Sequence, residues 1–141
     1  MRMPAKTRRQ QILRVAARLF SQHGFDATTT REIAQSAAVN EAIIFRHFTS
    51  KDVLYWAVVS EQISKRRYTQ RLRRHLRSPQ EPMQALSGLA EILLFKRQGD
   101  VAFSRLLLFS ALREGDLADK SFRDPINECL NLLAEYLREA V

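Results

Sequence analysis

The sequence has few glycines and prolines, which interrupt helices, one cysteine, and no long apolar run that could cross a membrane. Its 141 residues include four glycines, four prolines and one cysteine, Cys129. A lone cysteine cannot form an internal disulfide, so we expect Cys129 to be a buried, inert thiol. No stretch approaches 18 apolar residues without a charge, which excludes a membrane-spanning helix. The basic N-terminus leads into a polar helical pattern rather than a secretory signal, and we expect a cytoplasmic protein.

The motifs of catalytic, cofactor and metal sites are also missing. The sequence contains no nucleophile elbow, no glycine-rich phosphate loop and no pair of carboxylates near a histidine. Its histidines, His23, His47 and His75, are scattered without the spacing of metal ligands. We therefore expect a protein that is not an enzyme and that holds neither a cofactor nor a metal.

Charge is divided unevenly along the chain. Residues 1–78 hold 16 Lys and Arg against 5 Asp and Glu, whereas residues 79–141 hold 7 against 10. The net charge of +8 is thus a half of +11 beside a half of −3. This division indicates that one end of the protein meets a polyanion. Nucleic acid is the leading partner, and an anionic membrane surface attracts Lys and Arg by the same charge.

Apolar residues recur at helical spacing almost throughout, so we predict an all-α fold. A first helix is expected over 7–22, ended by Gly24 in a left-handed conformation. Ser50 caps a long helix to about residue 75, and the proline-containing segment 77–82 breaks the pattern. The helices expected after this break are 83–98, 101–113 with Asp100 as its cap, and a last one that begins at Pro125 or, with a proline kink, at Asp116.

Two short helices between residues 29 and 47 carry strong capping signals. Thr29 and Glu32 have the spacing of a capping box, which predicts a helix over 30–37 and stabilises it by roughly 1 kcal/mol. Asn40 is a second N-cap and predicts a helix over 41–47. Because only two residues separate these helices, they must cross steeply, as in a helix-turn-helix motif.

Residues 7–55 contain an ordered set of short motifs: Ile12-Leu13, Ala16 to Phe20, Gly24-Phe25, Ala27 to Ala34, Ala38-Val39, Phe45-Arg46-His47-Phe48, and Ser50-Lys51 with Leu54. With these motifs at these spacings, the segment resembles the TetR family of bacterial transcription regulators. The resemblance implies a three-helix DNA-binding head over 1–55 and a helical ligand-binding and dimerisation body over 56–141. It implies a ligand-responsive repressor that acts as a homodimer on a palindromic DNA operator. Family members usually extend well past residue 141, and their last two helices generally form the dimer interface.

The resemblance also implies which residues meet DNA. The helix at 41–47 enters the major groove and the helix at 30–37 lies across the backbone. The four residues from Asn40 are expected at base edges, and Thr29, Thr30, His47 and Lys51 at phosphates. The full predicted set is Thr29, Thr30, Arg31, Asn40, Glu41, Ala42, Ile43, Phe45, Arg46, His47 and Lys51.

Two residues depart from the family pattern inside this set. Ala38 stands where a glycine is usual, and a left-handed alanine costs on the order of 1 kcal/mol. Phe45 stands where a tyrosine is usual and has no hydroxyl to donate to a phosphate. One backbone contact of the family is therefore not expected here.

The body offers a weaker set of candidates. Phe95, Phe103, Leu107 and Phe109 could line a ligand pocket, and plain core packing is the alternative for each. Tyr55 and Trp56 are expected at the junction of head and body. Two other functions stay open: a DNA-binding module without effector control, and a basic helical protein that binds RNA or a membrane surface through charge.

Overall fold

The computed structural model describes residues 4–94 and 101–140, and the predicted all-α fold is confirmed. The elements in chain order are α1 (Ala5–Ala27), α2 (Thr30–Ser36), α3 (Glu41–His47), α4 (Lys51–Arg66), α5 (Tyr68–Leu76), α6 (Pro82–Leu94), α7 (Val101–Ala111), α8 (Asp116–Ala118), a π-helical turn (Asp119–Arg123) and α9 (Asp124–Ala140). Over these residues no helix combines the length and the apolar character needed to cross a bilayer.

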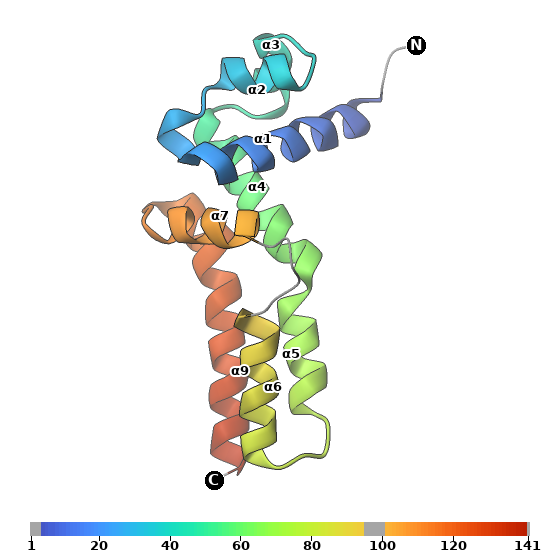
Figure 1. Cartoon of the computed structure of the whole chain (residues 1–141), viewed down its shortest axis with the longest axis vertical. Helices are drawn as coiled ribbons and strands as arrows, with labels where there is room; N and C mark the ends of the chain where they lie inside the picture. Colours follow the sequence, from blue (N-terminus) through green and yellow to red (C-terminus); the bar gives the residue numbers. More distant parts are fainter. Residues whose placement is uncertain (1–3, 95–100, 141) are drawn as a thin grey trace.

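The molecule is elongated, with its two ends built differently (Figure 1). Helices α1, α2 and α3 form a head at one end. Helices α5, α6 and α9 run lengthwise as a body, and the chain ends at the far tip. Helix α4 leads from the head into the body, across the predicted boundary at residue 55, and α7 lies across the long axis between the two parts (Figure 1).

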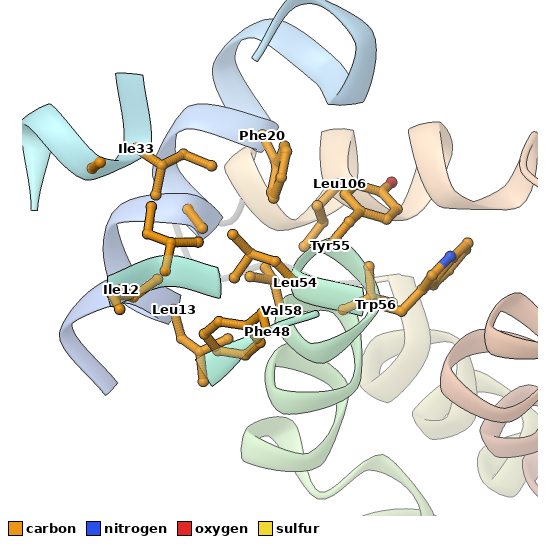
Figure 2. Packing of buried hydrophobic residues seen from close by; sticks show 14 of the residues in the cluster. Ile12, Leu13, Phe20, Ile33, Phe48, Leu54, Tyr55, Trp56, Val58 and Leu106 are labelled. Atoms are coloured by element: carbon orange, nitrogen blue, oxygen red, sulfur yellow. The ribbon is translucent and has the colours of Figure 1, made fainter. Parts of the chain in front are cut away.

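A cluster of buried side chains joins the head to α4, α7 and α8. Phe20 of α1, Ile33 of α2 and Ile44 of α3 are buried in it, and α4 adds Leu54 and Tyr55. Burying each such side chain contributes roughly 1.5–3 kcal/mol. The same cluster contains Leu106 of α7 and Ala118 of α8, and Figure 2 shows Leu106 beside Tyr55. The predicted position of Tyr55 and Trp56 at the junction is confirmed, since both are buried there.

Helix α1 is longer than expected at both ends. Gly24 adopts φ 79° and ψ 176°, so its φ is positive as predicted, but its ψ is extended instead of left-handed helical. One more helical turn follows through Phe25, and α1 ends at Ala27. Gly24 therefore kinks the helix instead of ending it. This turn brings Phe25 back over the core, where its ring centroid lies 5.3 Å from that of Tyr55.

The prediction of one helix from residue 51 to residue 75 is wrong. Arg67 has φ 51° and ψ 39°, and this left-handed residue separates α4 from α5. Neither glycine nor proline marks the break, and a left-handed arginine costs roughly 1–2 kcal/mol. Tertiary packing offsets that cost, because the break lets α5 bury Leu72 and pack against both α6 and α9.

The last helical segment begins early. Helical structure runs from Asp116 to Ala140, which supports the earlier of the two predicted starts. Pro125 lies in the first turn of α9, just after a five-residue π-helical turn. Proline has no amide hydrogen to donate to the preceding turn, and the wider turn accommodates that loss. The predicted cap Asp100 and the predicted helix end near residue 98 lie outside the described residues.

Candidate nucleic-acid interface

The start of α2 is closed by the predicted capping box. The Thr29 hydroxyl accepts from the amide of Glu32 at 3.1 Å, and Glu32 Oε2 accepts from the Thr29 amide at 2.8 Å. The hydroxyl also donates to the same carboxylate oxygen at 2.9 Å. These bonds to Thr29 lower the pKa of Glu32. Because the hydroxyl already donates and accepts within the box, a phosphate contact by Thr29 would have to replace one of these bonds.

The start of α3 is capped by Asn40, as predicted. Asn40 Oδ1 accepts from the amide of Ile43 at 3.0 Å. Bidentate recognition of adenine uses both the oxygen and the nitrogen of an Asn side chain. If Asn40 read adenine in this way, it would have to release its cap. With the cap in place, its Nδ2 is the group that can donate to a base.

A further bond, which spacing alone did not predict, ties the two helix starts together. The Thr30 hydroxyl donates to Glu41 Oε2 at 2.9 Å. Glu41 was predicted at a base edge and Thr30 at a phosphate. Each therefore also fixes the angle between α2 and α3, and sequence reasoning missed this because the two residues lie eleven positions apart.

The turn between α2 and α3 keeps the left-handed geometry despite the alanine. Ala38 has φ 52°, and the Val39 amide donates to the Ala34 carbonyl at 3.0 Å. Helix α1 supports the turn through Gln11 Nε2, which donates to the carbonyl of Ala37 at 2.8 Å. Ala38 thus adopts the left-handed conformation in this turn and carries the strain expected of alanine.

Helix α3 has one buried and one exposed face. Ile44 is buried, and Phe48 follows it into the core. Ala42, Phe45 and Arg46 are exposed on the other face, and Phe45 keeps 45% of its surface accessible. A phenylalanine this exposed at the tip of the head suits an interface. Of the remaining predicted residues, Arg31 is exposed, while Ile43 and His47 are half-buried.

Lys51 is held by the head itself. Its Nζ donates to the carbonyls of Phe25 at 2.9 Å and Thr28 at 3.1 Å, and it lies 4.1 Å from the centre of the Phe25 ring. The predicted phosphate contact would compete with these bonds. The sequence carries no local signal for this arrangement, because the partners precede Lys51 by more than twenty residues.

The body contains a half-open cavity of about 530 Å³ beside α5, α7 and α9. Its apolar lining comprises Ile63, Leu89, Phe103, Leu107, Pro125, Ile126, Leu130 and Leu133. Its polar lining comprises Ser64, Arg67, Tyr68, Thr69, Gln70, Glu128 and Cys129. The structure thus brings two of the four predicted ligand-binding residues, Phe103 and Leu107, to one cavity.

The other body predictions have different outcomes. Phe109 lines no part of that cavity, since its ring packs against Gly24 of the head, 3.7 Å from where a Cβ would lie. Phe95 lies outside the described residues. Cys129 was expected to be buried but is half-buried in the cavity wall, with its sulfur 3.8 Å from Thr69 Oγ1. Among the residues that the structure describes, no three His, Cys, Asp or Glu side chains gather as a metal site.

Known proteins share the helix-turn-helix segment described above. The family model of bacterial regulatory proteins of the TetR family matches residues 12–58, which run from the core of α1 into α4. Residues 12–58 of this chain therefore match the DNA-binding region of the TetR family. The match contains both short helices, the turn at Ala38 and the exposed face of α3. The TetR resemblance seen in residues 7–55 is therefore confirmed.

The sequence similarity between this chain and its relatives lies mainly in the head. The HTH-type transcriptional repressor Rv1474c of Mycobacterium tuberculosis is 38% identical over 58 residues, 41% of this chain and 31% of that protein. The HTH-type transcriptional regulator AcrR of Shigella flexneri is 36% identical over 104 residues, 72% of this chain and 45% of that protein. The chain thus spans about a third of the first relative and under half of the second.

A solved structure extends the likeness over the body. A protein of Shewanella sp. PV-4, assigned to the TetR family of transcription regulators, superposes with a TM-score of 0.67 at 25% identity. The superposition covers 94% of this chain and 69% of that protein. The helical body therefore follows the TetR fold, although its sequence is less similar than that of the head.

Proposed function

We propose that this chain is a TetR-family, sequence-specific DNA-binding regulator of transcription, most simply a cytoplasmic repressor. The observation that carries the proposal is the exposed face of α3, which presents Phe45 and Arg46 to solvent. The two caps fix that face in place. The name of the Mycobacterium relative, a transcriptional repressor, favours repression.

In this proposal α3 enters the major groove and α2 crosses the phosphate backbone. Arg46 is long enough to reach a base edge or a phosphate, and Ala42 and Ile43 can contact thymine methyl groups. The free amides at the capped helix starts favour phosphates. A homodimer would place two heads on half-sites about 34 Å apart on a palindromic operator.

We further propose that a small molecule in the body cavity controls the DNA affinity. The cavity volume of about 530 Å³ lies within the range of roughly 300–1,000 Å³ that small-molecule sites occupy. Its lining is mainly apolar with several polar groups, as in such sites. A ligand there could change the separation of two heads without altering any contact to a base.

The decisive experiment is selection of bound sequences from a random duplex pool, followed by sedimentation of the chain with the enriched duplex. We expect an inverted repeat that binds two chains. Arg46→Ala should weaken binding by about 1–3 kcal/mol, whereas Arg105→Ala, which removes an exposed arginine from α7, should not. Salt-sensitive binding without any enriched sequence would instead support the charge-driven alternatives, RNA or a membrane surface. A single chain bound to a half-site would support a module without effector control.

A further inference from the structure

Helix α7 contacts both the cavity of the body and the head. Phe103 and Leu107 line the cavity of the body. Leu106 is buried in the cluster that also holds the head, and the ring of Phe109 packs against Gly24 of α1. Figure 1 shows this helix lying between the head and the lengthwise helices of the body. A shift of α7 at the cavity is therefore also a shift at the head.

Arg113, two residues beyond α7, makes the polar contact between this helix and the head. Its Nη2 donates to Asp52 Oδ1 at 2.7 Å, at the start of α4. Its guanidinium carbon lies 3.6 Å from the centre of the Phe25 ring and 5.5 Å from that of Tyr55. An ion pair at the surface permits many geometries, but a guanidinium held on an aromatic ring as well is fixed in position.

The Phe25 ring connects this contact to the DNA-reading helices. Lys51 of the head also lies against this ring, and its Nζ holds the carbonyls of Phe25 and Thr28. Thr28 immediately precedes the capping box of α2. The ring thus has one cation from the head and one from the body, and the backbone beside it leads directly into α2.

We infer that Arg113 is a positioning residue that locks the head to α7 through Phe25 and Asp52, so that the orientation of α2 and α3 follows the state of the cavity. This inference rests on the proposed function for its biological meaning. The lock itself is a property of the free chain, and it can be tested without a ligand or an operator.

The first test measures amide hydrogen exchange in the free 141-residue chain. Arg113→Gln removes the charge, and Arg105→Gln makes the same change at an exposed position of α7. We expect Arg113→Gln to speed exchange at residues 25–34 by about tenfold through local opening. Arg105→Gln should change it less than twofold, and Arg113→Lys should fall between them. Equal exchange at residues 25–34 in the two Gln variants would overturn the inference.

The second test uses the reciprocity of coupling between two sites, with the enriched duplex as the probe. In the wild-type chain, bound duplex should slow exchange of the amides at residues 103–110. In Arg113→Gln that response should disappear at duplex concentrations that saturate the variant. An arginine that only stabilises the fold would leave the response in place, and that result would overturn the inference.

The two proposals can fail separately. If no duplex is enriched but exchange at residues 25–34 responds selectively to Arg113→Gln, the lock stands and the proposed function falls. If duplex binds, but exchange at residues 25–34 is equal in the two Gln variants and Arg113→Gln keeps the response at residues 103–110, the proposed function stands and the lock falls.

Discussion

The head and the body of this chain are stabilised in different ways. In the head, Thr29, Asn40 and Ser50 cap three successive helices with side-chain bonds, and a dense apolar cluster lies beneath them. In the body, α9 has no buried residue over its described length, and Leu130 keeps 56% of its surface exposed. The comparison teaches that local caps and a dense core shape the end proposed to read DNA, whereas the body leaves apolar surface available to a ligand or a second subunit.

The largest expected effect contrasts a leucine from each region. Leu54→Ala opens a cavity in the head cluster and should lower the free energy of unfolding by about 2–5 kcal/mol. Leu130→Ala removes a half-exposed side chain and should cost less than about 1 kcal/mol. Urea denaturation followed by circular dichroism measures both. Similar losses for the two variants would show that the body surface is covered in solution, for example by a second copy.

Alkaline pH should act on the junction between the two regions. Burial raises the pKa of Tyr55 to about 12, while the neighbouring Ser110 hydroxyl and the charge of Arg113 oppose the rise. The folded chain thus keeps a proton that the unfolded chain loses near pH 10. This contribution to stability is complete below about pH 10, is lost as pH rises toward 12, and amounts to about 2–3 kcal/mol.

The variant Tyr55→Phe isolates this contribution. Its free energy of unfolding should fall less than that of the wild-type chain between pH 9.5 and 12 by about 2 kcal/mol, as followed by chemical denaturation. Tyr136→Phe, which changes a half-buried tyrosine of α9, is the matched control and should retain the wild-type loss. The same alkaline loss in Tyr55→Phe would assign it to other groups.

The capping box predicts a smaller effect that is confined to the head. Thr29→Ala removes the hydroxyl that accepts from the Glu32 amide and should destabilise α2 by about 1 kcal/mol. Hydrogen exchange of residues 30–36 should increase more than that of α9. Thr49→Ala, which alters an exposed threonine outside the box, serves as the control. Equal responses to both substitutions would argue against a stabilising box.

The smallest expected effect reverses the usual sign of a glycine substitution. Ala38 has φ 52°, so Ala38→Gly should stabilise the chain by about 0.5–1 kcal/mol. Ala102→Gly, at an exposed position of α7, should destabilise it by a similar amount. Thermal unfolding of both variants gives the comparison. A loss of stability in Ala38→Gly would mean that the turn is held by the alanine methyl group.

Sequence reasoning succeeded where the structure depends on neighbouring residues. The caps at Thr29 and Asn40 and the positive φ of Gly24 follow from local patterns, and each was predicted. The all-α fold follows in the same way from periodicity. These features make the helix-turn-helix motif predictable from the sequence.

The remaining features depend on contacts between distant parts of the chain. The long helix breaks at Arg67, and the break lets α5 pack against α6 and α9. No glycine or proline at this position predicts the break. Phe109 was a candidate for a ligand pocket with core packing as the alternative, and it packs on Gly24, 85 positions earlier. Periodicity identifies an apolar face and does not say which surface will cover it. Of the candidate site, the exposed face of α3 was predictable, whereas the bonds that hold Glu41 and Lys51 were not.

The continuous cluster that includes Leu106 and Ala118 limits how such a protein can be recombined. A cut after α4 would remove both side chains and leave Phe20 and Tyr55 without part of their cover. A head moved alone onto a foreign body would thus begin with an incomplete core. Exchange of DNA specificity between related regulators should therefore succeed more often when α7 and α8 travel with the head, or when only the exposed residues of α3 are replaced.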